Sequence, residues 1–247
     1  MTKHETPPET LPDLDGLSRQ IVDLARQAGA AILEVYGSDF EVHVKEDRSP
    51  LTEADLASER IILAGLKHLT PDIPVLAEET GGAPYEERRA WRRCWLVDPL
   101  DGTRELVKRN GEFTVNIALV EDGKPILGVV HAPVEDLSYR AARGEGAYRQ
   151  GSGAETRIES SPPEEKLRLV MSRSHADERT RRFVAHLEQE FEVEAVARGS
   201  ALKMCLVADG TAHLYPRLGP TMEWDVAAAQ CIVEEAGAEL VTLDGRP

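Results

Sequence analysis

Two aspartates lie three residues apart in the segment WLVDPLDGTREL, which spans residues 95–106. An apolar run leads to Asp98, a proline bends the chain after it, and Asp101 precedes the predicted start of a short helix. Hard divalent cations prefer oxygen ligands, which the two carboxylates and the carbonyl of Leu100 between them supply. Asp-Pro and Asp-Gly pairs also form ordinary turns. The segment therefore predicts either a metal-binding loop or a polar turn.

Four further acids, in three segments, lie at the ends of predicted helices and strands. Glu78 and Glu79 end the apolar run IPVLAEE, where a pair of acids is more often solvated charge. Asp225 lies at the start of an alanine-rich predicted helix, where an acid usually complements the helix dipole. Asp55 follows Thr52 by three residues, the spacing of a capping box. Each acid alone has this ordinary explanation, but their coincidence favours a shared metal site.

The string WLVDPLDGT, with AEE upstream and WDVAAAQCIVEEAG downstream, resembles the inositol monophosphatase superfamily of Mg²⁺-dependent, lithium-sensitive phosphatases. Within it, DPLDGTRELVKRNGEFTVNIALV and HLYPRLGPTMEWD are most similar to the 3′(2′),5′-bisphosphate nucleotidases. These enzymes convert adenosine 3′,5′-bisphosphate to AMP, and the resemblance implies the same reaction here, in sulfur assimilation and nucleotide recycling. The similarity covers roughly residues 17–243 and implies a layered αβαβα sandwich like that of the sugar phosphatases. Members of this family typically continue beyond the point where this sequence stops, with a further strand and tail.

The resemblance also assigns roles to individual residues. The metal ligands that it implies, for two or three Mg²⁺ ions, are Glu78, Asp98, the Leu100 carbonyl, Asp101 and Asp225. Asp55 and Glu78, together with Thr103, would orient the attacking water. The amides of Gly102 and Thr103 would receive the phosphate, at the start of a helix where free N–H groups suit an anion.

Four residues in the second half of the chain match the positions that line the nucleotide site of the bisphosphate nucleotidases. They are His175, Ser200, Lys203 and Arg217, which would bind the adenosine and its 5′-phosphate. Where the family often has two serines, Ala201 follows Ser200 here. The residues also have ordinary explanations, because Ser200 could cap a helix, His175 could begin one, and the two cations could be surface charges.

Composition narrows the class of protein. The chain has 247 residues, a formal net charge of −15 and 41% hydrophobic residues, which is ordinary for a globular protein with one large domain or two small ones. A pI near 5.0 argues against a nucleic-acid polymer as partner. This charge also repels a phosphorylated substrate, so the chain needs a local positive centre such as bound Mg²⁺. A homodimer is compatible with these features.

Cysteine content and hydropathy bear on location. Three widely spaced cysteines exclude a disulfide scaffold, and Cys205 and Cys231 lie in apolar helical runs where buried, unreactive thiols are expected. No apolar run approaches the ~20 residues of a membrane span, and the first residues lack the apolar stretch of a signal peptide. A cytoplasmic location is the simplest expectation.

The elements that position these residues follow from apolar spacing. We expect residues 1–15 to be a flexible tail, because they are rich in Pro, Glu and Thr. Residues 16–160 are predicted to form an α+β, metal-binding half: two helices, from Leu17 to Gly37 and from Thr52 to about Leu69, then antiparallel hairpins. Residues 161–247 are predicted to form an α/β half that completes the metal and substrate site.

In this second half, strands and helices should alternate. The expected elements are the strands LRLVMS, VEAVA, AHLYP and AELVTL, with helices near 176–191, 200–208 and 224–236.

Two rival functions remain at this point. One is a phosphatase for inositol phosphate or a sugar bisphosphate, and the other is a catalytically inactive ligand-binding or regulatory protein on the same fold. The complete set of acids argues against an inactive protein, which would be free to lose at least one of them.

Overall fold

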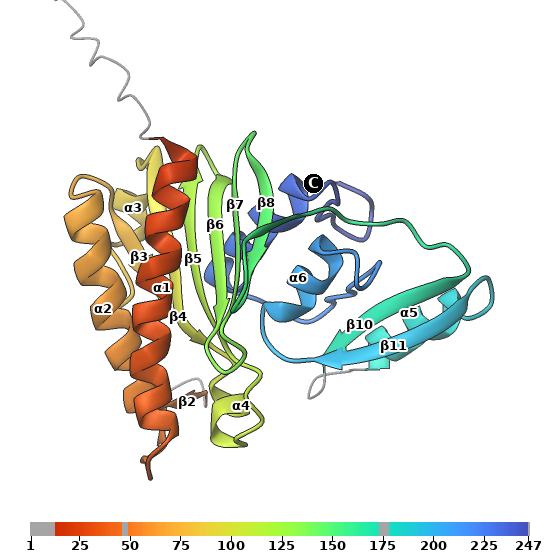
Figure 1. Ribbon diagram of the computed structural model, residues 1–247, viewed down its shortest axis with the longest axis horizontal. Coiled ribbons are helices and arrows are strands. Elements are labelled where there is room, and N and C mark those ends of the chain that lie inside the picture. The colour runs from red at the N-terminus through yellow and green to blue at the C-terminus, as the bar shows by residue number, and fades with distance from the viewer. Residues whose placement is uncertain (1–12, 46–48, 173–177, 247) are drawn as a thin grey trace, which may run out of the picture.

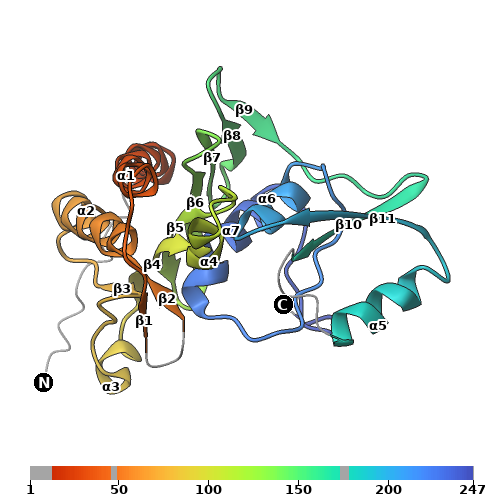
Figure 2. The same cartoon turned by 90° about the horizontal axis from the view of Figure 1, so that it is seen from below.

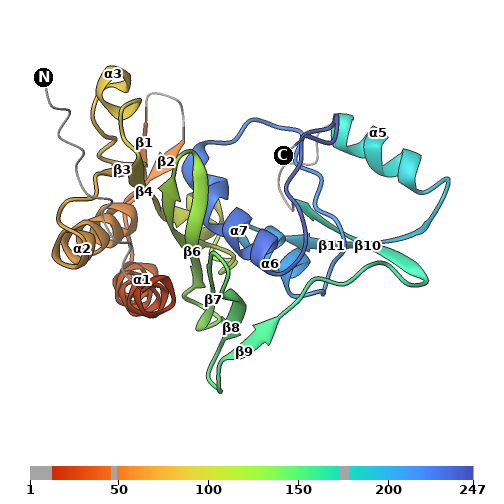
Figure 3. The ribbon, with the colours of Figure 1, turned by 90° about the horizontal axis from the view of Figure 1, so that it is seen from above.

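The computed structural model describes residues 13–45, 49–172 and 178–246, which form five layers (Figure 1). Helices α1 (Leu14–Tyr36) and α2 (Glu53–Leu69) cover one face of a seven-stranded sheet, and α6 (Leu202–Ala208) and α7 (Glu223–Glu235) lie on the other face. Beyond them come a two-stranded sheet and α5 (Glu178–Leu187), as Figures 2 and 3 show from below and above. The expected αβαβα sandwich is confirmed.

The large sheet has the strand order β3-β4-β5-β6-β7-β8-β9, in which only β3 and β4 pair in parallel. Its strands are β3 (Val75–Ala77), β4 (Arg93–Asp101), β5 (Thr114–Glu121), β6 (Lys124–Ala132), β7 (Leu137–Ala142), β8 (Gly146–Gln150) and β9 (Thr156–Ile158). The smaller elements are β1 (His43–Val44), β2 (Pro50–Leu51), α3 (Tyr85–Arg88) and α4 (Thr103–Val107). The predicted antiparallel hairpins of the middle region are thus present.

Strand β4 alternates between two cores, and this alternation decides where its acids lie. Trp95 and Val97 are buried in the core beneath α1 and α2, whereas Leu96 is buried in the core beneath α6 and α7. Because successive side chains of a strand point to opposite faces, Asp98 shares the face of Leu96. A shift in the β4–β5 register between Asp98 and Asp101 then ends the regular pairing. The strand therefore delivers its acids to the α7 side of the sheet.

Helix α7 belongs to the C-terminal part of the chain but packs against the large sheet. Its alanines Ala227, Ala228 and Ala229 are buried, and the Ala228 carbonyl lies so close to Gly128 of β6 that a Cβ atom there would be 2.1 Å from it. Small residues on both surfaces thus permit a close approach of helix and sheet. Since Asp225 lies in the first turn of α7, this packing fixes its position relative to β4.

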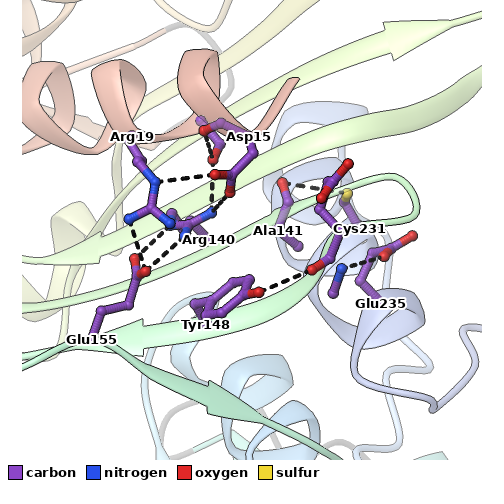
Figure 4. Close-up of polar contacts among 11 residues, drawn as sticks. Asp15, Arg19, Arg140, Ala141, Tyr148, Glu155, Cys231 and Glu235 are labelled. Atoms are coloured by element: carbon purple, nitrogen blue, oxygen red, sulfur yellow. Dashed lines mark hydrogen bonds and ion pairs between the residues drawn. The ribbon is translucent and has the colours of Figure 1, made fainter. Parts of the chain in front are cut away.

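A buried arginine joins α1 to the far strands of the sheet (Figure 4). The Arg140 side chain, which is 3% exposed, donates to Asp15 at 2.6 Å and to Glu155 at 2.6 Å. Arg19 of α1 binds the same two acids. These contacts connect the first turn of α1, strand β7 and the segment between β8 and β9.

The second sheet differs in part from the prediction. Strands β10 (Lys166–Ser172) and β11 (Glu192–Arg198) pair in parallel, and the predicted strand AHLYP contributes a single bridge, from Leu214 to Leu169. The predicted strand AELVTL is wrong: this segment is coil, with Leu243 71% exposed. An apolar run forms a strand only where another strand pairs with it, and the described residues provide none there.

Helix boundaries and cysteines agree better with the sequence. The predicted N-terminal helices are present, with Thr52 as the residue that caps α2. Cys205 and Cys231 are buried and free, as expected. None of the helices in the described residues combines the length and apolarity that a membrane crossing requires.

Candidate active site

A cleft of about 930 Å³ lies where β4 meets α4, α6 and the start of α7. Figure 2 shows α4, α6 and α7 between the large sheet, which contains β4, and the strands β10 and β11. Of the residues singled out from the sequence, those that line the cleft are Asp101, Gly102, Thr103, Ser200, Lys203, Arg217 and Asp225. Asp55, Asp98 and the Leu100 residue are buried, each about 1% exposed, so they lie beneath the cleft rather than on its wall. His175 lies outside the described residues.

The acids of the cleft are close enough to repel one another. Burial raises the pKa of Asp98 well above its usual range, and the charges of Asp101, Glu78 and Asp225 raise it further. Burial likewise raises the pKa of Asp101 to about 6, although the cation of Lys203 opposes the shift. The pKa of Asp225 is raised by burial too, and Glu78 adds to the shift.

A divalent cation fits this donor set. Carboxylates buried beside one another are unfavourable unless a cation compensates them, and the Leu100 carbonyl adds a neutral oxygen ligand. Among the residues that the structure describes, however, no three His, Cys, Asp or Glu side chains form a finished metal site. Glu78 is the acid of this set whose carboxylate is bound by an ion pair with Lys45.

Glu78 follows β3 directly, and its N–H donates to the Val97 carbonyl of β4 at 3.1 Å. Its carboxylate accepts a hydrogen bond from Lys45 Nζ at 2.9 Å, and the same ammonium donates to Glu79 at 2.6 Å. Burial raises the pKa of Glu79 to about 7, while Lys45 lowers it. Lys45, which the sequence did not indicate, thus donates to one carboxylate oxygen of Glu78, an expected metal ligand.

Asp55 performs two tasks with its two oxygens. Oδ2 accepts from the N–H and the hydroxyl of Thr52, at 2.8 and 2.7 Å, which completes the capping box of α2. Oδ1 accepts from the Thr103 hydroxyl at 3.0 Å. Burial raises the pKa of Asp55, although its hydrogen bonds oppose the shift. The capping and catalytic interpretations of Asp55 are therefore compatible in one side chain.

Two more residues of α2 hold the acid-bearing turns. Ser58 donates to the Pro99 carbonyl at 2.7 Å, within the turn between Asp98 and Asp101. Glu59, 2% exposed, accepts from the N–H groups of Glu79 and Thr80 at 2.9 Å each. The sequence alone did not indicate either contact. The available signal was a set of polar residues on the buried face of an amphipathic helix, where apolar residues are the rule.

The chain enters α4 through a left-handed residue that has to be glycine. Gly102 has a φ of +99°, and a Cβ atom there would lie 3.1 Å from the Glu112 carbonyl. Gly102 and Thr103, at the start of this helix, both line the cleft.

The basic side of the cleft is built around Lys203. It is 7% exposed, donates to the Ser200 carbonyl and lies 5.4 Å from the centre of the Tyr215 ring. Burial lowers the pKa of Lys203, while Asp101 raises it. Arg217 is exposed at the rim and donates to the Pro220 carbonyl at 2.9 Å.

Ser200 does not cap α6, contrary to one interpretation of the sequence. It has a φ of +48°, and the residue that precedes the first turn is Ala201. A left-handed residue at this point turns the side chain away from the helix start. Its Oγ is buried and has no hydrogen-bond partner among the described residues, so Ser200 retains an unused hydroxyl next to Lys203.

Comparison with known proteins gives a consistent result. The family model described as the inositol monophosphatase family matches residues 13–247. The 3′(2′),5′-bisphosphate nucleotidase CysQ of Escherichia coli (strain K12) is 49% identical over 230 residues, covering 92% of this chain and 91% of the relative. CysQ of Salmonella typhimurium is 50% identical over 229 residues, with coverages of 92% and 91%.

A solved structure agrees with these relatives. The crystal structure of CysQ from Bacteroides thetaiotaomicron has a TM-score of 0.81 and 41% identity to this chain, covering 91% of it and 88% of the other chain. The shared fold, the matched length and the acids of the cleft lead to one conclusion. The chain belongs to the inositol monophosphatase family.

Proposed function

We propose that this enzyme is a Mg²⁺-dependent 3′(2′),5′-bisphosphate nucleotidase that hydrolyses adenosine 3′,5′-bisphosphate to AMP and phosphate. One observation carries the proposal: a single cleft is lined by the acids Asp101 and Asp225 and by the cations Lys203 and Arg217. A substrate with two phosphates needs a reaction site for one and a cationic site for the other. The names of the CysQ relatives support the same substrate, and sulfur assimilation and nucleotide recycling are the processes in which we place it.

The acids Glu78, Asp98, Asp101 and Asp225, with the Leu100 carbonyl, are the residues that would hold the Mg²⁺ ions. The bound ions would supply Lewis-acid chemistry, polarising the phosphoryl group and increasing the acidity of water. Glu78, whose carboxylate Lys45 binds, would join this set because a divalent cation compensates more negative charge than one ammonium does.

Thr103 and Asp55 act on the water. The Thr103 hydroxyl donates a hydrogen bond to Asp55. The Thr103 oxygen can therefore accept a hydrogen bond from the attacking water. Asp55 is buried, and its raised pKa suits a group that takes up a proton during the reaction. The N–H groups of Gly102 and Thr103 lie at the helix start, where they can bind the phosphate oxygens.

The other end of the cleft would bind the nucleoside and its 5′-phosphate. Arg217 presents a planar guanidinium at the rim, a group suited to two phosphate oxygens at once. Lys203 adds a second cation and Ser200 an unused hydroxyl. His175 keeps its proposed role from the sequence alone. A cytoplasmic location and a homodimer also stay predictions.

The test measures phosphate release from adenosine 3′,5′-bisphosphate and from inositol 1-phosphate, with Mg²⁺, with EDTA and with added Li⁺. We expect faster release from the nucleotide, and loss of release in EDTA or Li⁺. Faster release from inositol 1-phosphate would contradict the proposal and favour the alternative, a phosphatase for inositol phosphate or a sugar bisphosphate. A folded enzyme that acts on neither would support the inactive, ligand-binding alternative.

Asp98→Asn provides a matched variant for this assay. The substitution removes one buried charge and keeps the side-chain shape, so we expect turnover to fall by about 100-fold or more while the thermal midpoint of the metal-free protein does not fall. Glu235→Gln is the control, because Glu235 lies at the other end of α7 and binds the Gly144 and Gly146 amides. Unchanged turnover in Asp98→Asn would contradict the metal assignment.

A further inference from the structure

Asn116 is a polar residue in the middle of β5 that the proposed reaction has not used. It is 1% exposed and pairs directly with Asp98 of β4. Residues opposite each other in an antiparallel pair present their side chains to the same face of the sheet. Asn116 therefore belongs to the face that carries the acids, and its neighbour Ile117 belongs to the opposite core.

The orientation of the Asn116 amide is set by Thr114. The Thr114 hydroxyl is fully buried and donates to Asn116 Oδ1 at 2.9 Å. Because the amide oxygen is engaged by this donor, the Nδ2 group is directed away from Thr114. Thr114 itself pairs with Asp101 across the two strands. The threonine thus fixes which end of the amide is available to the acids.

Asn116 Nδ2 is buried and donates no complete hydrogen bond within the described part of the chain. A buried N–H group without an acceptor is destabilising, and native structures contain few of them. On this face Asn116 lies opposite Asp98, and a hydrogen-bonding interaction with Asn116 lowers the pKa of Asp101. A carboxylate can only accept hydrogen bonds, and Asn116 Nδ2 has a hydrogen to donate. We therefore infer that the contact between Asn116 Nδ2 and the Asp101 carboxylate becomes shorter when the site binds a cation.

We propose that Asn116 is a positioning residue, whose Nδ2 group holds the Asp101 carboxylate in the orientation that binds a divalent cation. The inference rests on the metal site of the proposed function. A carboxylate has more lone pairs than one cation uses, so it can accept from Asn116 while it binds the ion. Such neighbours of a ligand typically change metal affinity by about 10–100-fold when they are removed.

The test is calorimetric titration of the full-length, metal-free protein with Mn²⁺, without substrate, for wild type, Asn116→Leu and Thr114→Val. Leucine keeps the approximate volume of asparagine and removes the donor, and we expect affinity to fall about tenfold. Valine keeps the Asn116 amide but removes the hydroxyl that orients it, and we expect a smaller loss. The KM for the nucleotide should not change in either variant.

Thermal unfolding separates this role from a purely structural one. We expect Asn116→Leu to leave the melting temperature of the metal-free protein nearly unchanged and to reduce the increase that Mn²⁺ produces. Ile117→Val is the control: it loosens the same strand on its other face and should lower the melting temperature without changing the Mn²⁺ affinity.

Equal Mn²⁺ affinity in Asn116→Leu and wild type, or in Thr114→Val if the first variant does not fold, overturns the proposal. A wild-type protein that binds Mn²⁺ but hydrolyses no nucleotide contradicts the proposed function alone, because the titration still compares the variants. A wild-type protein that binds no Mn²⁺ overturns both.

Discussion

Individual residues in and beneath the cleft reduce the stability of the metal-free protein. Burial raises the pKa values of Asp98 and Asp101, neighbouring acids raise them further, and Asn116 Nδ2 is buried without an acceptor in the described residues. Buried charges and donors of this kind destabilise a fold unless a ligand compensates them. These unfavourable groups lie on the face on which α7 delivers Asp225, and binding of a ligand there would relieve them.

A substitution of Arg217 tests the proposed site for the second phosphate. Its guanidinium would contact only the phosphate that does not react, so Arg217→Ala should raise KM for adenosine 3′,5′-bisphosphate about 10–100-fold and leave KM for a monophosphate nearly unchanged. The measurement is steady-state kinetics on both substrates, with Arg182→Ala as control because Arg182 lies on the exposed face of α5. Equal increases on both substrates would remove Arg217 from the second phosphate site.

The acids could be found from the sequence because they end apolar runs, and their roles came from the family resemblance. Lys45, Ser58 and Glu59 could not be found in this way. A lysine in a polar segment, or a serine in a helix, resembles a solvated residue until the partner across the fold is known. The interpretation of Ser200 as a helix cap was wrong for a related reason. A capping motif does not reveal the positive φ that turns the Ser200 side chain away from α6.

At the scale of elements, α2 aligns the site. Its buried polar residues bind three separate segments: Asp55 holds Thr103, Ser58 holds the Pro99 carbonyl, and Glu59 holds the turn after β3. Helical geometry places residues three and four apart on one face, so one rigid helix sets the spacing of these segments. Apolar periodicity predicted the helix and its buried side but not what its polar residues bind.

Glu59→Gln tests this alignment. Glutamine keeps one acceptor oxygen and turns an NH₂ group toward the second backbone N–H, so we expect a loss of about 1–3 kcal/mol in the free energy of unfolding. Because the turn carries Glu78, the Mg²⁺ concentration for half-maximal activity should rise as well. Urea denaturation and Mg²⁺ titration measure the two effects, with the exposed Glu53→Gln on the same helix as control. An unchanged Mg²⁺ requirement would restrict Glu59 to stability.

At the scale of the whole molecule, the site is assembled from distant parts of the chain. Asp55 and Glu78 come from the first third, Asp98 and Asp101 from the middle, and Asp225 from the C-terminal part that packs against the same sheet through α7. The sequence predicted the alternation of layers, since periodicity is local. It mispredicted AELVTL as a strand, because strand formation depends on a partner that local pattern does not specify.

The Arg140 cluster (Figure 4) makes the stability of the whole molecule depend on pH. Hydrogen bonds from Arg140 lower the pKa of Glu155 from its ordinary 4.5. Partial burial would raise the pKa of Asp15 from 3.8, but hydrogen bonds from Arg140 and Arg19 outweigh it and lower the value. Acids whose pKa falls on folding stabilise the protein above their ordinary values, and this stabilisation disappears as pH falls through the folded values.

We therefore expect Arg140→Met to reduce the free energy of unfolding near pH 7 by an amount at the lower end of about 3–5 kcal/mol, because its partners are partly exposed. The difference from wild type should stay constant down to about pH 5 and shrink below about pH 4. Urea denaturation across this range provides the measurement. A difference that grows at low pH would contradict the assignment of the cluster.

The central claim is tested most directly by following the phosphorus atoms of adenosine 3′,5′-bisphosphate by ³¹P NMR during the reaction with Mg²⁺. We expect the 3′-phosphate signal to disappear while inorganic phosphate and 5′-AMP appear in equal amounts. Removal of the 5′-phosphate, or a substrate that stays intact while inositol 1-phosphate is consumed under the same conditions, would contradict it.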